Sequence, residues 1–68
     1  MHFKIFKLET EKRTIIAKKG IEEEGVRCVE LASFRTKELR DFTYERLKAF
    51  MEVSPEYKDR KFIWKEQP

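Results

Sequence analysis

The sequence predicts a small α+β protein, in which a mostly antiparallel sheet carries one amphipathic helix on one face, in the order β-β-β-α-β. Three observations support this class. The 68 residues suffice for a single domain spanning 1–68. Segments rich in aromatic and β-branched residues, which favour strands, occupy the N-terminal half and return near the C-terminus. Between them, residues 37–53 lack Gly and Pro and repeat apolar residues at helical spacing.

The first predicted strand covers residues 2–8 and is apolar on both sides. Phe3 and Ile5 would face one side of the sheet, whereas Phe6 and Leu8 would face the other. Such a change of phase is typical of a β-bulge or of a strand that is covered on both faces.

Two further strands are expected to follow the first and to complete an antiparallel meander. A polar turn over residues 9–12 leads into a strand over 13–18, so that the first two strands form a hairpin. Gly20 and Gly25 bracket an acidic run, which predicts a loop. A third strand is then expected over residues 26–34.

The helix is the element that the sequence predicts most directly. Thr36 is a favourable N-cap, and Glu38 places a negative charge in the first turn, where it suits the helix dipole. The apolar residues that share one stripe, and are expected to face the sheet, are Leu39, Phe42, Leu47, Phe50 and Val53. The charged residues expected on the opposite side are Lys37, Asp41, Glu45, Lys48 and Glu52.

A short fourth strand is predicted over residues 61–65, after the helix ends. Pro55 stops the helix and disfavours helical geometry at Ser54, although these two residues could also begin one further helical turn. We expect the sheet order 3-2-1-4, with the fourth strand parallel to the first, because that order makes the doubly apolar first strand central. Residues 66–68 are expected to fray.

Composition excludes several classes of protein. The single cysteine cannot form an intramolecular disulfide, which excludes a disulfide-stapled secreted protein. The longest uninterrupted apolar runs are three residues, too short for a transmembrane helix or a signal peptide. Hydrophobic residues make up 40% of the chain and aromatic residues 13%, which argues against disorder. We therefore expect a cytoplasmic protein without a membrane contact.

The residues that usually carry catalysis or bind cofactors are scarce. His2 is the only histidine and has no evident orienting partner, while Cys28 is the only thiol and suits a small buried position. The consecutive residues Glu22–Glu24 lack the spacing of a calcium loop, and two glycines cannot build a phosphate-binding loop. We expect no enzyme, no metal and no cofactor, although an active site built at an oligomer interface stays open.

The charge is modest in total but uneven along the chain. The formal net charge is +3. Residues 1–19 contain six basic and two acidic side chains, whereas residues 20–34 contain one basic and four acidic side chains. These segments suit either two solvated surfaces that complement each other or contacts with a charged partner.

Basic and aromatic residues alternate in both terminal strands, which suggests contacts with nucleic acid. Cations among exposed aromatic rings suit single-stranded nucleic acid. The residues that would make these contacts are Lys4, Lys7, Lys61, Trp64 and Lys65. In the ordinary interpretation, the aromatic side chains form the core and the lysines face water.

Residues of the helix suggest contacts with a protein. Arg46 lies inside the apolar stripe, where it would snorkel past the sheet edge, pair with a carboxylate such as Glu30, or belong to an interface. Arg40, Tyr44 and Met51 lie on the flank of the stripe and are of types enriched in interfaces, although they also suit ordinary boundary positions.

Together, these patterns favour a small non-catalytic binding or regulatory protein that acts through protein–protein contacts. Inhibitors and adaptors of phages and mobile elements are often of this kind. The alternative is a nucleic-acid-binding module that uses the terminal strands. A homodimer is compatible with either function, because the sheet has open edges.

Overall fold

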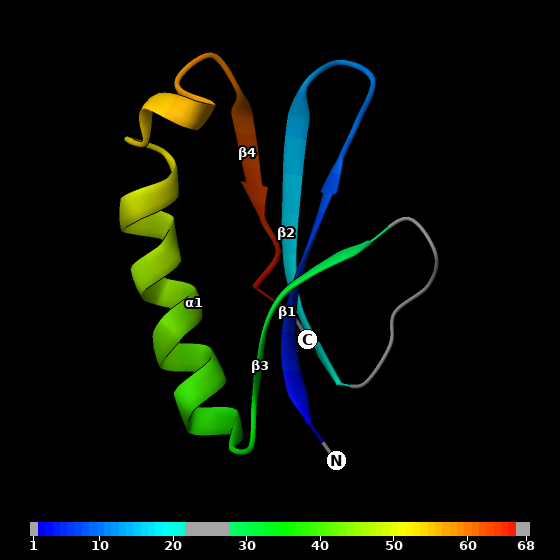
Figure 1. Cartoon of the computed structure of the whole chain (residues 1–68), viewed down its shortest axis with the longest axis vertical. Helices are drawn as coiled ribbons and strands as arrows, with labels where there is room; N and C mark the ends of the chain where they lie inside the picture. The colour runs from blue at the N-terminus through cyan, green and yellow to red at the C-terminus, as the bar shows by residue number, and fades with distance from the viewer. Residues whose placement is uncertain (1, 22–27, 67–68) are drawn as a thin grey trace.

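The computed structural model describes residues 2–21 and 28–66, and it confirms the α+β class. A four-stranded mixed sheet packs against one helix (Figure 1). The elements in chain order are β1 (Phe3–Glu9), β2 (Thr14–Ile21), β3 (Val29–Phe34), α1 (Lys37–Met51), the 3-10 helix η1 (Pro55–Tyr57) and β4 (Lys61–Trp64).

The strand boundaries differ from the sequence prediction mainly around Gly20. We expected Gly20 to begin a loop, but Gly20 and Ile21 continue β2 because they pair with Lys4 and Phe3 of β1. Some predicted features lie outside the described residues. They are the acidic residues Glu22–Glu24 with Gly25, the first two residues of the predicted third strand, and residues 67–68 at the end that was predicted to fray.

The predicted hairpin between β1 and β2 is confirmed. The backbone N–H of Thr10 donates to the carbonyl oxygen of Thr14 at 2.8 Å, and the Thr10 hydroxyl oxygen accepts from the Thr14 N–H at 3.2 Å. Arg13 completes the turn with a φ of 65°, in the left-handed region that most residues avoid. The side chain of Thr10 thus replaces part of the hydrogen bonding that the turn interrupts.

The predicted sheet order is wrong, because the order found is β3-β1-β2-β4. Strand β1 is antiparallel to both β2 and β3, and β4 is parallel to β2 rather than to β1. Both central strands bury large apolar side chains, including Ile5 and Phe6 of β1 and Ile15 of β2. The more exposed β3 and the short β4 form the edges, where unpaired backbone groups can reach water.

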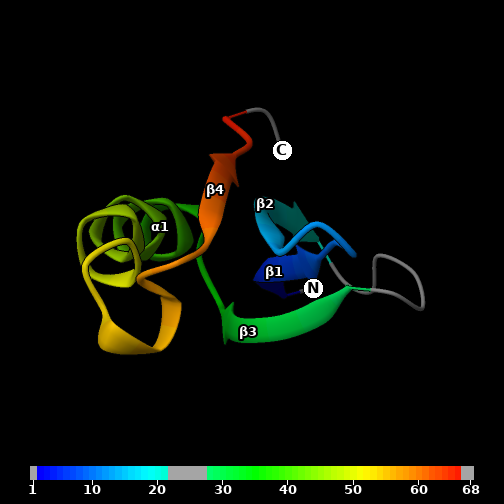
Figure 2. The ribbon, with the colours of Figure 1, turned by 90° about the horizontal axis from the view of Figure 1, so that it is seen from above.

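The bulge expected in β1 lies instead in β3, since β1 pairs with β2 in unbroken register and shifts register only against β3. Ile5 pairs with Ala32, but Phe6 pairs with Glu30, so that Leu31 is the extra residue of a bulge. The consecutive residues Ile5 and Phe6 are both buried. The sheet is curled, and its edge strands β3 and β4 approach α1 from two sides (Figure 2).

The limits of α1 follow the sequence signals closely. The Thr36 hydroxyl oxygen accepts a hydrogen bond from the Leu39 N–H at 3.2 Å, which confirms the predicted N-cap. The helix ends at Met51, two residues before the predicted end, and Pro55 begins the further turn η1. With 15 residues and many charges, α1 is too short and too polar to cross a membrane, and no described helix is able to do so.

The predicted buried face of α1 is wrong. Leu39, Phe42, Phe50 and Val53 were expected in the core but are 51–76% exposed. The residues of α1 that are buried in their place are Arg40, Tyr44 and Met51, with Leu47 partly buried beside them. The core thus consists of Ile5, Ala17 and Tyr44, surrounded by partly buried residues of α1, β3 and β4.

Candidate protein-binding face

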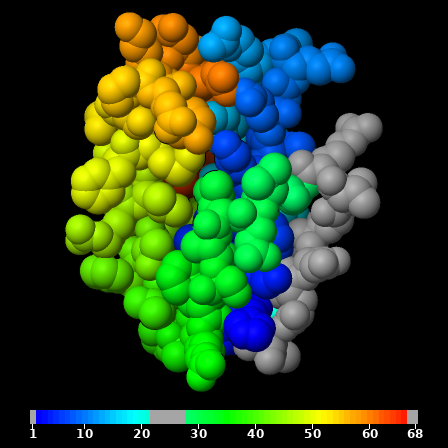
Figure 3. Space-filling view, viewed as in Figure 1, coloured from blue at the N-terminus to red at the C-terminus, as the bar shows by residue number. Residues whose placement is uncertain are grey.

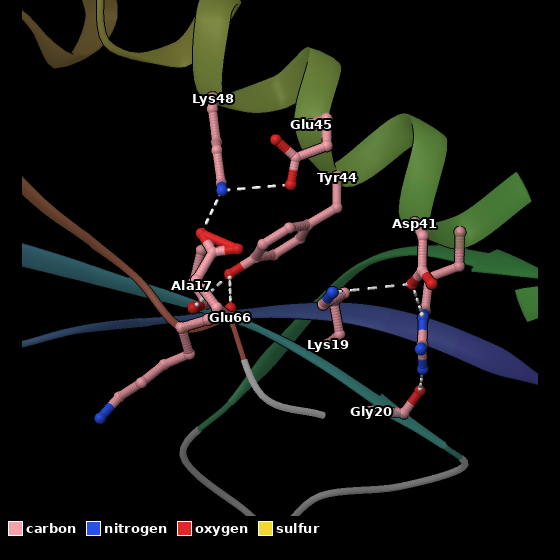
Figure 4. A network of polar contacts seen from close by, with 10 residues as sticks. Ala17, Lys19, Gly20, Asp41, Tyr44, Glu45, Lys48 and Glu66 are labelled. Atoms are coloured by element: carbon pink, nitrogen blue, oxygen red, sulfur yellow. Dashed lines mark hydrogen bonds and ion pairs between the residues drawn. The ribbon is translucent and has the colours of Figure 1, made fainter. Parts of the chain in front are cut away.

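Tyr44 fixes the inner face of α1 to the sheet. Its hydroxyl group lies 2.8 Å from the carbonyl oxygen of Ala17 and 2.6 Å from that of Lys65 (Figure 4). The hydroxyl group therefore lies between β2 and the residue after β4, and the two carbonyl oxygens share its single hydrogen. The ring meets Trp64 edge-on, with centroids 5.6 Å apart. Burial, followed by the negative charge of Glu66, raises the pKa of Tyr44 to about 12.

Arg40 is the second polar residue that α1 directs into the fold. Its side chain is 1% exposed. Nη1 donates to the carbonyl oxygen of Gly20 at 2.8 Å, Nε donates to Asp41 Oδ1 at 3.0 Å, and the guanidinium lies 5.4 Å from the centre of the Phe3 ring. A buried guanidinium is tolerated when such partners compensate its lost hydration.

The predicted exposed flank formed by Arg40, Tyr44 and Met51 is therefore wrong. All three side chains are 8% exposed or less, and those of Arg40 and Tyr44 bond to strand β2. Arg40 and Tyr44 also carry hydrogen-bond donors that reach backbone carbonyl oxygens, which Leu or Phe at these positions could not satisfy. Of the four residues predicted at a protein interface, only Arg46 is exposed.

The outer face of α1 carries an apolar stripe with a cation at its centre. We call this the outer stripe; it consists of Leu39, Phe42, Arg46 and Phe50 of α1 and of Val53, two residues beyond the end of the helix. Assuming 100° per residue, the four helical positions fall within about 80° of the helix circumference. The Arg46 guanidinium lies 5.5 Å from the centre of the Phe42 ring and 5.7 Å from that of Phe50. The two rings and the cation thus form one continuous column.

The structure bears on two of the three interpretations of Arg46. Arg46 does not pair with Glu30, because Glu30 contacts Lys4 at 2.7 Å. It does not snorkel past the sheet, because it lies on the face of α1 that points away from the sheet. Within residues 2–21 and 28–66, its guanidinium contacts two aromatic rings and no carboxylate. The interpretation as part of an interface stays a prediction.

An acidic row follows one side of the outer stripe. It consists of Glu38, Glu45 and Glu52, which are exposed and spaced by seven residues. Glu45 contacts Lys48 at 3.1 Å, and Lys48 also binds Glu66 (Figure 4). The hydrogen bond to Glu66 raises the pKa of Lys48. The outer stripe is therefore bordered by negative charge, with Lys48 beyond it toward the sheet.

The structure does not bring the predicted nucleic-acid contacts together. We expected β1 and β4 to be neighbours, which is wrong because β2 lies between them. Lys4 contacts Glu30, and Lys7 donates to the Tyr57 hydroxyl oxygen at 3.2 Å. Both cations of β1 are thus engaged within the fold.

The residues in and after β4 that were predicted to contact nucleic acid differ in burial. Trp64 packs against the core and stacks on Phe62 at a centroid distance of 5.5 Å. Lys61 and Lys65 are exposed, but the Trp64 side chain between them is partly buried and is not an open surface on which a base could stack. An aromatic platform flanked by cations is therefore not formed by these residues.

The sheet also has an open hollow beside the β1–β2 turn. Its volume is about 720 Å³, and its lining includes Leu8, Ile16 and Ile63. The lining also includes the acidic residues Glu9 and Glu11, but it contains no histidine or cysteine. Among the described residues, no three His, Cys, Asp or Glu side chains gather as ligands of a metal would.

Compared with protein-family models, with curated proteins and with solved structures, the chain shows no significant match to any of them. Function therefore has to be inferred from geometry. Sequence reasoning assigned the outer stripe to the core and so missed it as a candidate binding surface. Arg46 was the signal that could have identified it, because a guanidinium in the middle of an apolar stripe would be costly to bury without a partner.

Proposed function

We propose that this is a non-catalytic binding or regulatory protein that uses the outer stripe of α1 to bind another protein. The observation that carries the proposal is the 51–76% exposure of Leu39, Phe42, Phe50 and Val53 around Arg46. Single exposed apolar residues are common, but a continuous apolar surface with a polar border is typical of an interaction site. Arg and Phe are also enriched in interface cores.

The free energy gained by burying the outer stripe suggests a partner that covers more than the stripe. Burying a whole Leu or Phe side chain contributes roughly 1.5–3 kcal/mol, so that four half-exposed side chains would contribute roughly 3–6 kcal/mol. Association itself costs an estimated 4–15 kcal/mol. The apolar contacts alone would give weak binding, and further polar or apolar contacts are needed for a stable complex.

Affinity capture from the source cells tests the proposal. The bait is the tagged chain, compared with a Phe42→Ser and Phe50→Ser double variant in which both side chains start 59% exposed. The matched control is Val29→Ser with Ile63→Ser, which removes apolar side chains that are 55% and 47% exposed on the sheet. Each capture is run with and without nuclease, and all baits are checked by thermal denaturation.

We expect the wild type and the sheet control to recover the same protein, and the stripe variant to lose it. Recovery of that protein by all three baits would contradict the proposal. Recovery of nucleic acid in place of protein, released by salt, would favour the alternative in which Lys61 and Lys65 contact nucleic acid.

A further inference from the structure

We infer that the partner presents an amphipathic helix with a carboxylate near the middle of its apolar face and basic residues along one edge. The inference rests on the proposed function and specifies the chemistry of the partner. It follows from three features of α1, namely the spacing of the outer stripe, the central cation and the acidic row.

The spacing of the outer stripe suits the side of another helix. Its members follow one another at steps of three, four, four and three residues. Leu39, Arg46 and Val53 are seven residues apart, and so are the members of the acidic row, as in helices that pack along a common seam. From Leu39 to Phe50 the stripe runs roughly 16 Å along α1, at 1.5 Å per residue. A narrow convex ridge of this kind packs into the groove between the side-chain rows of a second helix.

The central cation specifies a carboxylate. A partner that covers Phe42 and Phe50 also covers the guanidinium between them, which has no carboxylate partner within the described part of the chain. Two aromatic faces attract the cation but leave its N–H donors without acceptors. A carboxylate from the partner would accept two of these donors in a bidentate pair and compensate the lost hydration.

The acidic row specifies basic residues. Glu38, Glu45 and Glu52 border the outer stripe along its length, and they would face the edge of a helix seated there. Residues at such flanking positions set the choice of partner through opposite charges. Lys or Arg on the facing edge would therefore favour binding, whereas acidic residues would oppose it.

The same charges argue against a second copy of this chain. The stripe has the same spacing in both directions from Arg46, so a two-fold antiparallel pair would place Arg46 against Arg46 and Glu45 against Glu45. A parallel pair in register would also bring the two guanidinium groups together at the seam. Like charges in these positions are repulsive, so the outer stripe is better matched by a different chain.

Two synthetic peptides serve as probes. Each has three heptads with leucine on the seam; the first carries Glu at the central seam position and Lys on both edges, and the second carries Lys at the centre and Glu on the edges. Fluorescence anisotropy measures their binding to the wild type and to Arg46→Leu, Arg46→Lys and Arg46→Glu. Because Arg46 is exposed, all four proteins should be folded, which circular dichroism and thermal denaturation check.

We expect the wild type to bind the Glu-centred peptide at least about tenfold more tightly than the Lys-centred peptide. Arg46→Leu should weaken the Glu-centred peptide at least about tenfold, because its carboxylate loses its partner. Arg46→Glu should reverse the charge preference at the central seam position, so that this variant binds the Lys-centred peptide more tightly than the wild type does. Arg46→Lys should lose less than Arg46→Leu, since it keeps the charge but not the bidentate geometry.

Three results with the peptides would overturn the inference. The first is equal binding of both peptides. The second is tighter binding by Arg46→Leu, which would indicate a wholly apolar partner surface. The third is no binding of either peptide at about 1 mM, the weak end of association. The proposed function fails separately, if the capture experiment finds no protein whose recovery depends on Phe42 and Phe50. Self-association of the wild type in sedimentation, abolished by Phe42→Ser, would replace the different chain with a second copy.

Discussion

The two faces of α1 reverse the usual distribution of polar and apolar residues. The inner face buries a guanidinium and a phenol, those of Arg40 and Tyr44, whereas the outer face exposes the rings of Phe42 and Phe50 (Figure 3 shows the molecule as a solid, with α1 along one side of it). The difference teaches that the buried face of a helix is chosen by hydrogen bonding as well as by hydrophobicity. A face is buried when every polar group on it finds a partner.

Magnitudes explain why the more apolar face is the outer one. Turning α1 to bury its outer stripe would gain the roughly 3–6 kcal/mol of apolar burial. It would also bury Arg46 without a carboxylate, at a cost that exceeds this gain for an unpaired ion. The hydrogen bonds of Tyr44 and Arg40 to backbone carbonyl oxygens, worth about 1 kcal/mol each or more, would be lost as well.

The largest expected contrast is between two aromatic residues of α1. Tyr44→Ala should destabilise the fold by about 3–5 kcal/mol, because it empties a core position and removes the donor to the Lys65 carbonyl oxygen. Phe42→Ala should change the free energy of unfolding by no more than about 0.5 kcal/mol, because the ring is 59% exposed. Urea denaturation at neutral pH measures both. Similar losses in the two variants would mean that both faces of α1 are packed in solution.

The two arginines give a smaller contrast. Arg40→Ala should cost about 2–4 kcal/mol, since it removes the donor to the Gly20 carbonyl oxygen and leaves a void under the helix. Arg46→Ala should be nearly neutral, because only two exposed cation–π contacts are lost. The shift of the thermal midpoint distinguishes them. A large loss for Arg46→Ala would show that Arg46 supports the fold and would weaken its assignment to an interface.

The smallest contrast concerns the ionisation of Tyr44 on the inner face of α1, which does not change stability at neutral pH. The pKa of Tyr44 is raised from 10.0 to about 12 in the folded protein, so the unfolded chain releases this proton first as pH increases. The corresponding stability is complete below pH 10 and is lost between about pH 10 and 12. Lys48, whose pKa is also raised, changes stability in the same direction.

Denaturation in urea from pH 8 to 12 measures this slope. Tyr44→Phe should flatten most of it, because Phe cannot ionise, while the part due to Lys48 should persist in that variant. An equally steep decline in Tyr44→Phe would show that other groups control alkaline unfolding.

The local structure of this chain could be predicted from its sequence, because each signal acts over a few residues. Thr36 caps α1 as its side chain suggests, and the apolar residues on both sides of β1 include the consecutive buried pair Ile5 and Phe6, although the bulge beside them lies in β3. Gly20 was misassigned to a loop because its pairing with Lys4 is not visible in the local sequence.

The arrangement of the elements was less predictable, because it depends on contacts between distant residues. Nothing adjacent to β4 in the sequence indicates that it would choose β2 over β1. The buried face of α1 depends on backbone carbonyl oxygens of Ala17, Gly20 and Lys65, whose positions are known only once the sheet is formed. The candidate site was therefore predicted at Arg46 alone, and its surroundings were assigned to the wrong side of the helix.

The bond between the Lys65 N–H and the Ala17 carbonyl oxygen, 2.9 Å long, has a consequence for the order of folding. It joins residues 48 positions apart, whereas the β1–β2 turn joins Thr10 and Thr14. Closing the longer loop costs about 2 kcal/mol more chain entropy than closing the turn. We expect the hairpin to form early and β4 to dock last, once α1 has shortened the path between β2 and the C-terminal strand. The hydroxyl of Tyr44, which contacts both ends of this loop, then completes its contacts in the final step.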